Sequence, residues 1–80
     1  MLEHVAFYSD HDRGFLIDRR TGDLYRLNAT GVLILKSIRS GESPSRIVAE
    51  LCKEYQVAPE QAEDDFETFM ERLRDRGIIQ

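Results

Sequence analysis

The side chains that could carry out chemistry are few and lie mainly near the start of the 80-residue chain. Asp10, His11 and Asp12 are consecutive and His4 precedes them, so these residues can be considered as metal ligands. Metal sites commonly show histidine or cysteine pairs at short fixed spacings, and this sequence has none of that kind. A D-H-D run is more often a solvated turn. We therefore expect neither a metal site nor a bound cofactor.

Cys52 is the single cysteine and a second candidate for chemistry. It could act as a nucleophile, but it falls on the apolar face of a predicted helix, where a buried packing role is favoured by roughly nine to one. The sequence offers no Ser/His/Asp constellation and no Gly-rich phosphate loop. A chain of this length buries roughly 60% of its unfolded surface, which forms one core and leaves no deep catalytic cavity. We therefore expect a protein that is not an enzyme.

Composition is that of a small globular protein. Hydrophobic residues make up 41% and charged residues 32%, so we expect residues 1–80 to form a single domain. The net charge of -4 argues against a nucleic-acid partner, although Arg19, Arg20 and Arg26 could contact phosphates. No apolar run approaches the roughly 20 residues of a membrane span, and the N-terminus lacks the pattern of a signal peptide. With one cysteine and no internal disulfide, a cytoplasmic location without membrane binding is the expectation.

The segment from Gly22 to Gly41 organises the rest of the chain, because it predicts a strand that leads directly into a helix. Asp23–Leu27 is the expected strand. Asn28 is a good N-cap, since its side-chain oxygen can accept from the free N–H groups of the first turn. Four consecutive apolar residues, Val32 to Leu35, predict a helix that is apolar nearly all round and buried in the middle. Gly41 supplies the left-handed stop.

Two further strands precede this segment. The sequence predicts one over His4–Tyr8 and another over Phe15–Asp18, separated by a turn at Ser9–Gly14 that is rich in Asp and Gly. A hairpin loop at Arg19–Gly22 leads into the third strand. Short loops between consecutive strands predict an antiparallel meander, in which an outer edge is either open or covered.

Two helices follow the central one. Pro44, after a serine N-cap, starts a helix whose apolar face is formed by Ile47, Val48, Leu51, Cys52 and Tyr55. Pro59 starts the last helix, whose core stripe is formed by Ala62, Phe66, Phe69 and Leu73, with Met70 on one flank. Gly77 ends this helix and lets Ile78 fold back on Leu73. The predicted fold is therefore α+β, with a three-stranded antiparallel sheet followed by three helices.

Four motifs resemble the PqqD family in order and spacing: Y-R-L-N-A-T-G, S-G-E-S-P-S-R-I-V-A-E-L, Y-Q-V-A-P-E and F-M-E-R-L-R-D-R-G-I-I. The resemblance covers the chain from about Phe15 onward. The H-V start and the chain length resemble the small stand-alone members found in lasso-peptide gene clusters. The resemblance implies a winged helix-turn-helix fold. It also implies a role as a RiPP recognition element, which binds the leader segment of a ribosomally made precursor peptide.

In this family the leader pairs as an extra strand with the third strand and lies beside the third helix. The partners implied for the lasso branch are a leader peptidase and a macrocycle-forming cyclase. An open sheet edge is consistent with that role, because it offers unpaired N–H and C=O groups to an extended peptide. From the residues alone, a merely solvated edge is the preferred interpretation, and the resemblance is what favours binding.

The expected peptide-binding residues come from the third strand and from both flanks of the third helix, because the sequence does not tell which flank faces the leader. They are Asp23, Leu24, Tyr25, Arg26, Leu27, Asp65, Phe66, Phe69, Met70, Arg72 and Leu73. Strand alternation places Tyr25 and Leu27 toward the core and the residues before each of them on the other side. By resemblance, lasso leaders present a Tyr and a Pro a turn apart, and Phe69 with Met70 could supply a pocket for the Tyr.

Two other functions stay open. A PqqD-type protein could serve a radical SAM enzyme by the same mechanism. A winged helix could instead bind DNA, but E-D-D-F-E-T-F-M-E in the third helix would bring at least four carboxylates towards phosphate, which is repulsive. The acidic run Glu60–Glu67 is most simply a solvated face that complements the helix dipole, and its alternative role is to attract a basic peptide.

Overall fold

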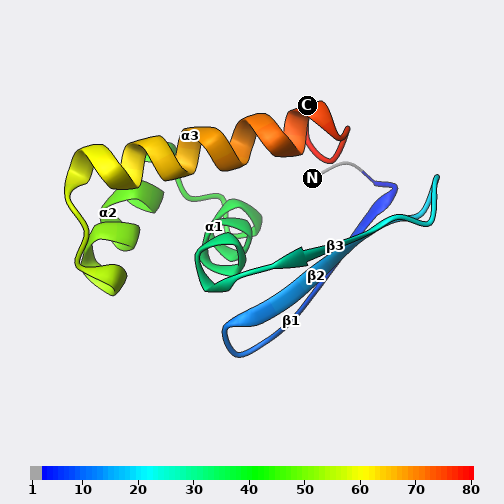
Figure 1. Ribbon diagram of the computed structural model, residues 1–80, viewed down its shortest axis with the longest axis horizontal. Coiled ribbons are helices and arrows are strands. Elements are labelled where there is room, and N and C mark those ends of the chain that lie inside the picture. The colour runs from blue at the N-terminus through cyan, green and yellow to red at the C-terminus, as the bar shows by residue number, and fades with distance from the viewer. Residues whose placement is uncertain (1–2) are drawn as a thin grey trace.

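β3, Leu24–Leu27, leads directly into α1, Ala29–Arg39, and Asn28 lies between them as the N-cap. The computed structural model describes residues 3–80. The other elements are β1 (Val5–Asp10), β2 (Arg13–Asp18), α2 (Pro44–Tyr55) and α3 (Pro59–Asp75). In Figure 1 the sheet lies at one end and α2 at the other, with α1 between them and α3 running along the length of the molecule. The α+β prediction is confirmed, and the order of elements is consistent with a winged helix.

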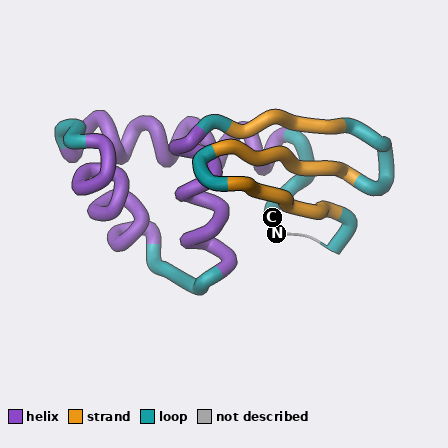
Figure 2. Tube along the Cα trace, turned by 90° about the horizontal axis from the view of Figure 1, so that it is seen from below, coloured by secondary structure: helices purple, strands orange, loops and turns teal. Residues whose placement is uncertain are grey.

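The sheet is the predicted antiparallel meander, in the order β1-β2-β3. Figure 2 shows the three strands side by side, next to the helices. The turn lies within the predicted segment Ser9–Gly14 but is shorter, because the ladder continues to the pair formed by Asp10 and Arg13, and only His11 and Asp12 connect the strands. His11 adopts a left-handed backbone (φ 56°), which closes this two-residue turn. The strands begin at Val5, Arg13 and Leu24, against predicted starts at His4, Phe15 and Asp23.

The helices begin at the residues that the sequence marks as caps. The Gly31 N–H donates to Asn28 Oδ1 at 2.9 Å, and the Arg46 N–H donates to Ser43 Oγ at 3.3 Å. Pro59 starts α3 without a side-chain cap. These bonds satisfy backbone N–H groups that have no partner inside the helix.

The helices end where the sequence predicted, two of them at a glycine and α2 at the exit expected over Gln56 and Val57. After α3, the Ile78 N–H donates to the Leu73 carbonyl at 2.9 Å while Gly77 is left-handed, which is the expected Schellman stop. Gly41 is left-handed after α1. α2 ends without a glycine, because Gln56 itself takes the left-handed conformation (φ 52°).

α1 joins two apolar clusters, as its run of apolar residues predicted. Leu35 packs with sheet residues and the end of α3, in a cluster of Val5, Leu16, Leu35, Leu73 and Ile78. Ile34 packs with α2 and the first half of α3, in a cluster of Ile34, Ile47, Leu51, Ala62 and Phe66. Tyr55, expected on the apolar face of α2, is 40% exposed. Within residues 3–80, no helix has both the length and the apolar character needed to cross a membrane.

Asp18, at the end of β2, has the only buried polar or charged side chain among residues 3–80. Its carboxylate accepts from the Arg20 backbone N–H at 2.9 Å and from Arg20 Nη2 at 3.2 Å. His4 Nε2 lies 4.0 Å from the same carboxylate and donates to the Gly77 carbonyl at 2.9 Å. The hydrogen bond from the Arg20 side chain lowers the pKa of Asp18 and outweighs burial, which raises it. This group therefore ties the sheet to the segment after α3.

Replacing Asn28 with alanine should destabilise the protein by about 1 kcal/mol, because the Gly31 N–H loses its acceptor at the strand-to-helix joint. Thermal melts followed by circular dichroism measure the loss. Asn28→Ser is the matched control, since serine caps nearly as well as asparagine. An alanine variant that melts like the native protein would place the start of the helix elsewhere.

A second prediction concerns pH. Because the pKa of Asp18 is lowered in the folded protein, the unfolded chain takes up this proton first as the pH falls. The stabilisation from the carboxylate is therefore complete above the ordinary pKa of about 3.9 and is lost as the pH falls through the lowered value. Asp18→Asn should lower the Tm at neutral pH and flatten the fall of Tm below about pH 4. Exposed Asp75→Asn should keep the native pH profile, and an unchanged profile in both variants would contradict the assignment.

Candidate functional site: an open strand edge beside α3

β3 lies at the edge of the sheet, with β2 on one side and no strand of the described residues on the other. The Asp18 N–H donates to the Asp23 carbonyl, so these two opposite residues form a hydrogen-bonded pair. Such pairs alternate along an antiparallel ladder with pairs that do not bond each other. Counting along the register from Asp23, Tyr25 and Leu27 bond to β2. Leu24 and Arg26 therefore direct their N–H and C=O groups to the open edge.

A groove of about 190 Å³ lies between β3 and the second half of α3. Its lining residues are Leu16, Tyr25, Arg26, Leu27, Phe69, Arg72, Leu73, Arg76 and Ile78. Tyr25 and Leu27 pack partly buried against the cluster that contains Leu73, as strand alternation predicted. Leu24, on the opposite side of the strand, is 54% exposed. The groove therefore has an apolar floor and runs beside the free backbone groups of β3.

Arg76 and Tyr25 form one end of the groove. The Arg76 guanidinium lies over the Tyr25 ring, 4.9 Å from its centroid, which is a favourable cation–π distance. Sequence reasoning missed Arg76. Helical spacing could have found it, because Phe69, Arg72, Leu73 and Arg76 recur at i, i+3, i+4 and i+7 and so share one face of α3.

Phe69 lies at the other end of the groove, next to the first turn of α1. A Cβ placed on Gly31 would come within 3.2 Å of the Phe69 ring, so the absence of a side chain at Gly31 lets the ring approach α1 closely. Phe69 also packs against both core clusters. Its ring is therefore held between the core and the groove.

The structure brings together six of the predicted peptide-binding residues at this groove: Tyr25, Arg26, Leu27, Phe69, Arg72 and Leu73. The flank of α3 that faces the strand is thus the one carrying Arg72. Asp23, Leu24, Asp65, Phe66 and Met70 do not line it. Phe66 is buried between α3 and the other helices, and Met70 packs partly buried against both clusters. Contacts of these five residues with a leader peptide remain predictions. The same holds for the pocket that Met70 and Phe69 were expected to form around a leader Tyr.

A second hollow covers the outer face of the sheet and has a volume of about 980 Å³. Tyr8, which is 51% exposed, stacks on Phe15 there with ring centroids 5.2 Å apart. Leu24 and Arg26 border the same hollow from β3. The outer face of the sheet is therefore more apolar than a solvated antiparallel face usually is.

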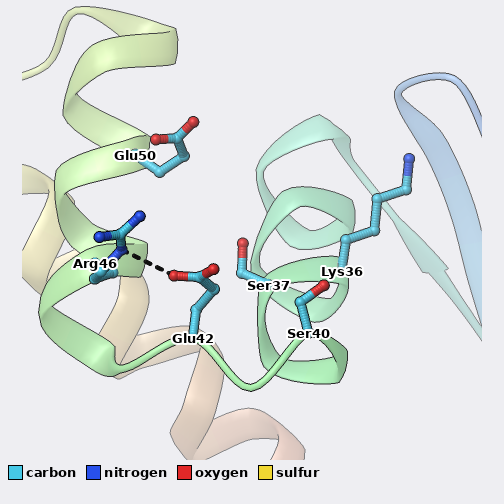
Figure 3. A pocket seen from close by; sticks show the side chains of 6 residues that line it. All are labelled: Lys36, Ser37, Ser40, Glu42, Arg46 and Glu50. Carbon is cyan, nitrogen blue, oxygen red and sulfur yellow. Dashed lines mark hydrogen bonds and ion pairs between the residues drawn. The ribbon is translucent and has the colours of Figure 1, made fainter.

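A third hollow, of about 240 Å³, lies between α1 and α2 and is lined by polar side chains. Figure 3 shows Glu42 and Arg46 joined by an ion pair of 3.0 Å, while Lys36 extends away from α2. Two serines also line it, but its lining includes no histidine or cysteine that could activate them.

The other candidates for chemistry lie apart from one another. His11 is exposed and lies 3.6 Å from the Asp10 carboxylate, whereas His4 bonds to the backbone of Gly77. Within residues 3–80, no group of three or more His, Cys, Asp or Glu side chains is arranged to hold a metal ion. Cys52 is partly buried and packs against the helical cluster.

Comparison with known proteins identifies the family. Residues 13–79 match the family described as coenzyme PQQ synthesis protein D, PqqD. This chain belongs to the PqqD family. No curated protein is found to match it.

Two solved structures are similar to this PqqD-family chain over nearly their whole length. One is TbiB1 in complex with the TbiA(beta) leader peptide, with a TM-score of 0.91, 26% sequence identity, and coverage of 99% of this chain and 92% of that one. The other is lasso peptide synthetase B1 complexed with the leader peptide, with a TM-score of 0.87, 28% identity, and coverage of 95% and 89%. Both of these structures are complexes with a leader peptide.

Proposed function

We propose that this protein binds the leader segment of a ribosomally made precursor peptide and delivers it to processing enzymes. The observation that carries the proposal is the open edge of β3 beside the groove of α3, in a fold shared with two leader-peptide complexes. The leader pairs with β3 as a fourth, antiparallel strand. Residues 1–80 act as one recognition domain.

Two kinds of contact contribute to binding. The N–H and C=O groups of Leu24 and Arg26 bond to the leader backbone, which gives affinity that does not depend on sequence. Alternate leader side chains then point into the groove, where they meet Leu27, Phe69 and Leu73. Each apolar side chain desolvated there contributes in proportion to its buried area, at about 25 cal/mol per Å². The groove therefore selects among peptides that all pair equally well with the edge.

The protein's own role is binding rather than chemistry, and catalysis belongs to its partners. By family, these partners are a leader peptidase and a lasso cyclase in the cytoplasm. A radical SAM enzyme is the alternative partner, and the description of the family as a coenzyme synthesis protein keeps it open. The identity of the processing enzyme encoded beside this protein distinguishes the two.

We expect this protein to bind neither nucleic acid nor membranes. The first half of α3 exposes Glu60, Glu63, Asp64, Asp65 and Glu67, and the chain carries a net charge of -4. These carboxylates would repel phosphate if α3 were used as a recognition helix.

Arg26→Pro should abolish binding of a fluorescent leader peptide, because proline removes the N–H that Arg26 directs to the open edge. Arg26→Ala is the matched control, since it removes the side chain and keeps the N–H. Fluorescence polarisation measures both affinities, and circular dichroism checks that both variants stay folded. Full binding by a folded proline variant would place the leader elsewhere on the surface.

The purified protein should leave its cognate precursor peptide unchanged in mass after prolonged incubation. Mass spectrometry of the peptide measures this. Adding the processing enzyme of the same pathway is the positive control and should produce cleavage or cyclisation. A change of mass produced by the purified protein alone would contradict the non-catalytic role.

A further inference from the structure

The groove beside β3 is basic, although the chain as a whole is acidic. Arg72 and Arg76 line it from α3, and no Asp or Glu belongs to its lining. Arg26 belongs to the same lining, but strand alternation turns its side chain to the other face of the sheet, where it borders the outer hollow. The net charge of the whole chain is -4. The acidic run of α3 lies in its first half and does not line the groove. The charged side chains that line the groove are therefore opposite in sign to the net charge of the chain, and the nearby Asp23 carboxylate, which accepts from the Tyr25 hydroxyl at 3.5 Å, lies outside the lining.

The charges of these arginines are not neutralised inside the protein. Neither Arg72 nor Arg76 has a carboxylate of the described residues within 4.0 Å, whereas Arg20 and Arg46 each have one. Arg76 is stacked on Tyr25 through the face of its guanidinium, and this arrangement leaves the N–H groups at the guanidinium edge able to donate. Arginine in this state is well suited to bind a carboxylate with two parallel hydrogen bonds.

The groove also has a direction. Phe69 lies at the Leu27 end, against α1, and Arg76 lies at the Tyr25 end, so α3 runs antiparallel to β3. A leader that is antiparallel to β3 therefore runs in the same direction as α3. It meets the apolar end of the groove first and the basic end second.

The spacing of the side chains along the groove matches the spacing of alternate residues in a strand. Leader residues opposite Leu27 and Tyr25 point to the groove side, because directly opposite residues in an antiparallel pair share a face. They are two positions apart, or about 6.8 Å. Arg72 and Arg76 follow Phe69 by three and seven residues, or about 4.5 Å and 10.5 Å along α3, and this interval includes the spacing of the two leader side chains. One leader residue can therefore contact Phe69 while the residue two positions later meets the arginines.

We propose that the groove recognises an acidic leader, in which an apolar residue is followed two positions later by Asp or Glu. The apolar side chain packs against Leu27 and Phe69, and the carboxylate bonds to Arg72 and Arg76. This inference rests on the proposed leader-binding function and adds the sequence class and direction of the ligand. Arg72 is the specificity-determining residue that can be tested most directly, because it is exposed and has no carboxylate of residues 3–80 within 4.0 Å.

A phage-displayed library of short random peptides tests the proposal without knowledge of the natural leader. Selection on the full-length protein should enrich peptides with the order apolar, any residue, acidic. Replacing the enriched acidic residue by its amide should weaken binding about fivefold, the upper range for a partly exposed ion pair. Peptides with the reversed order should bind no better than the amide version.

Arg72→Glu should remove the acidic preference and favour Lys or Arg at the same position. Arg74→Glu is the matched control, because Arg74 lies in the same last turn of α3, is also exposed and does not line the groove. Circular dichroism checks that both variants are folded. Enrichment of peptides without an acidic preference, or an acidic preference that survives in folded Arg72→Glu, would overturn the charge inference and leave leader binding intact. A native protein that enriches no peptide at all would overturn both.

Discussion

The hydrogen bond from the Gly31 N–H to Asn28 Oδ1 sits at the joint on which the rest of the structure depends. It fixes the place where β3 stops and α1 begins. α1 in turn supplies Leu35 to the cluster under the sheet and Ile34 to the cluster among the helices. A shift of this joint by one residue would turn every apolar side chain of α1 by about 100° about the helix axis. The position of α3 over the sheet, and with it the groove, therefore depends on where α1 begins and which of its side chains face each cluster.

Much of the fold could be predicted because its signals are local. Asn28, Ser43 and Gly77 each act through hydrogen bonds to residues within a few positions, and the structure has them as expected. The length of the turn at His11 could not be predicted in this way. The cross-strand pairs that shorten it to two residues are formed by Ser9, Asp10, Arg13 and Gly14, which look like loop residues in isolation.

The site was less predictable than the fold, because its residues meet only after α3 is laid across the sheet. Strand alternation gave the orientation of Tyr25 and Leu27 correctly, since that period is a property of the backbone. The sequence did not show which flank of α3 faces the strand, because Asp65, Met70 and Arg72 all border the same apolar stripe. Arg76 was missed since its partner, the Tyr25 ring, is 51 residues away in the sequence. The burial of Asp18 was missed for a different reason, because nothing in the hairpin sequence shows that the Arg20 side chain folds back onto this carboxylate.

An open strand edge is also a hazard, because it can pair with the same edge of another copy and begin an aggregate. Here the edge strand has only four residues, which limits the number of bonds that such a pairing could make. A symmetric antiparallel pairing of two β3 strands would also bring the Arg26 side chains of the two copies near one another on one face. Like charges on facing residues of two neighbouring strands repel. The shortness and the charge of β3 thus leave the edge available to a peptide while discouraging the chain from joining itself.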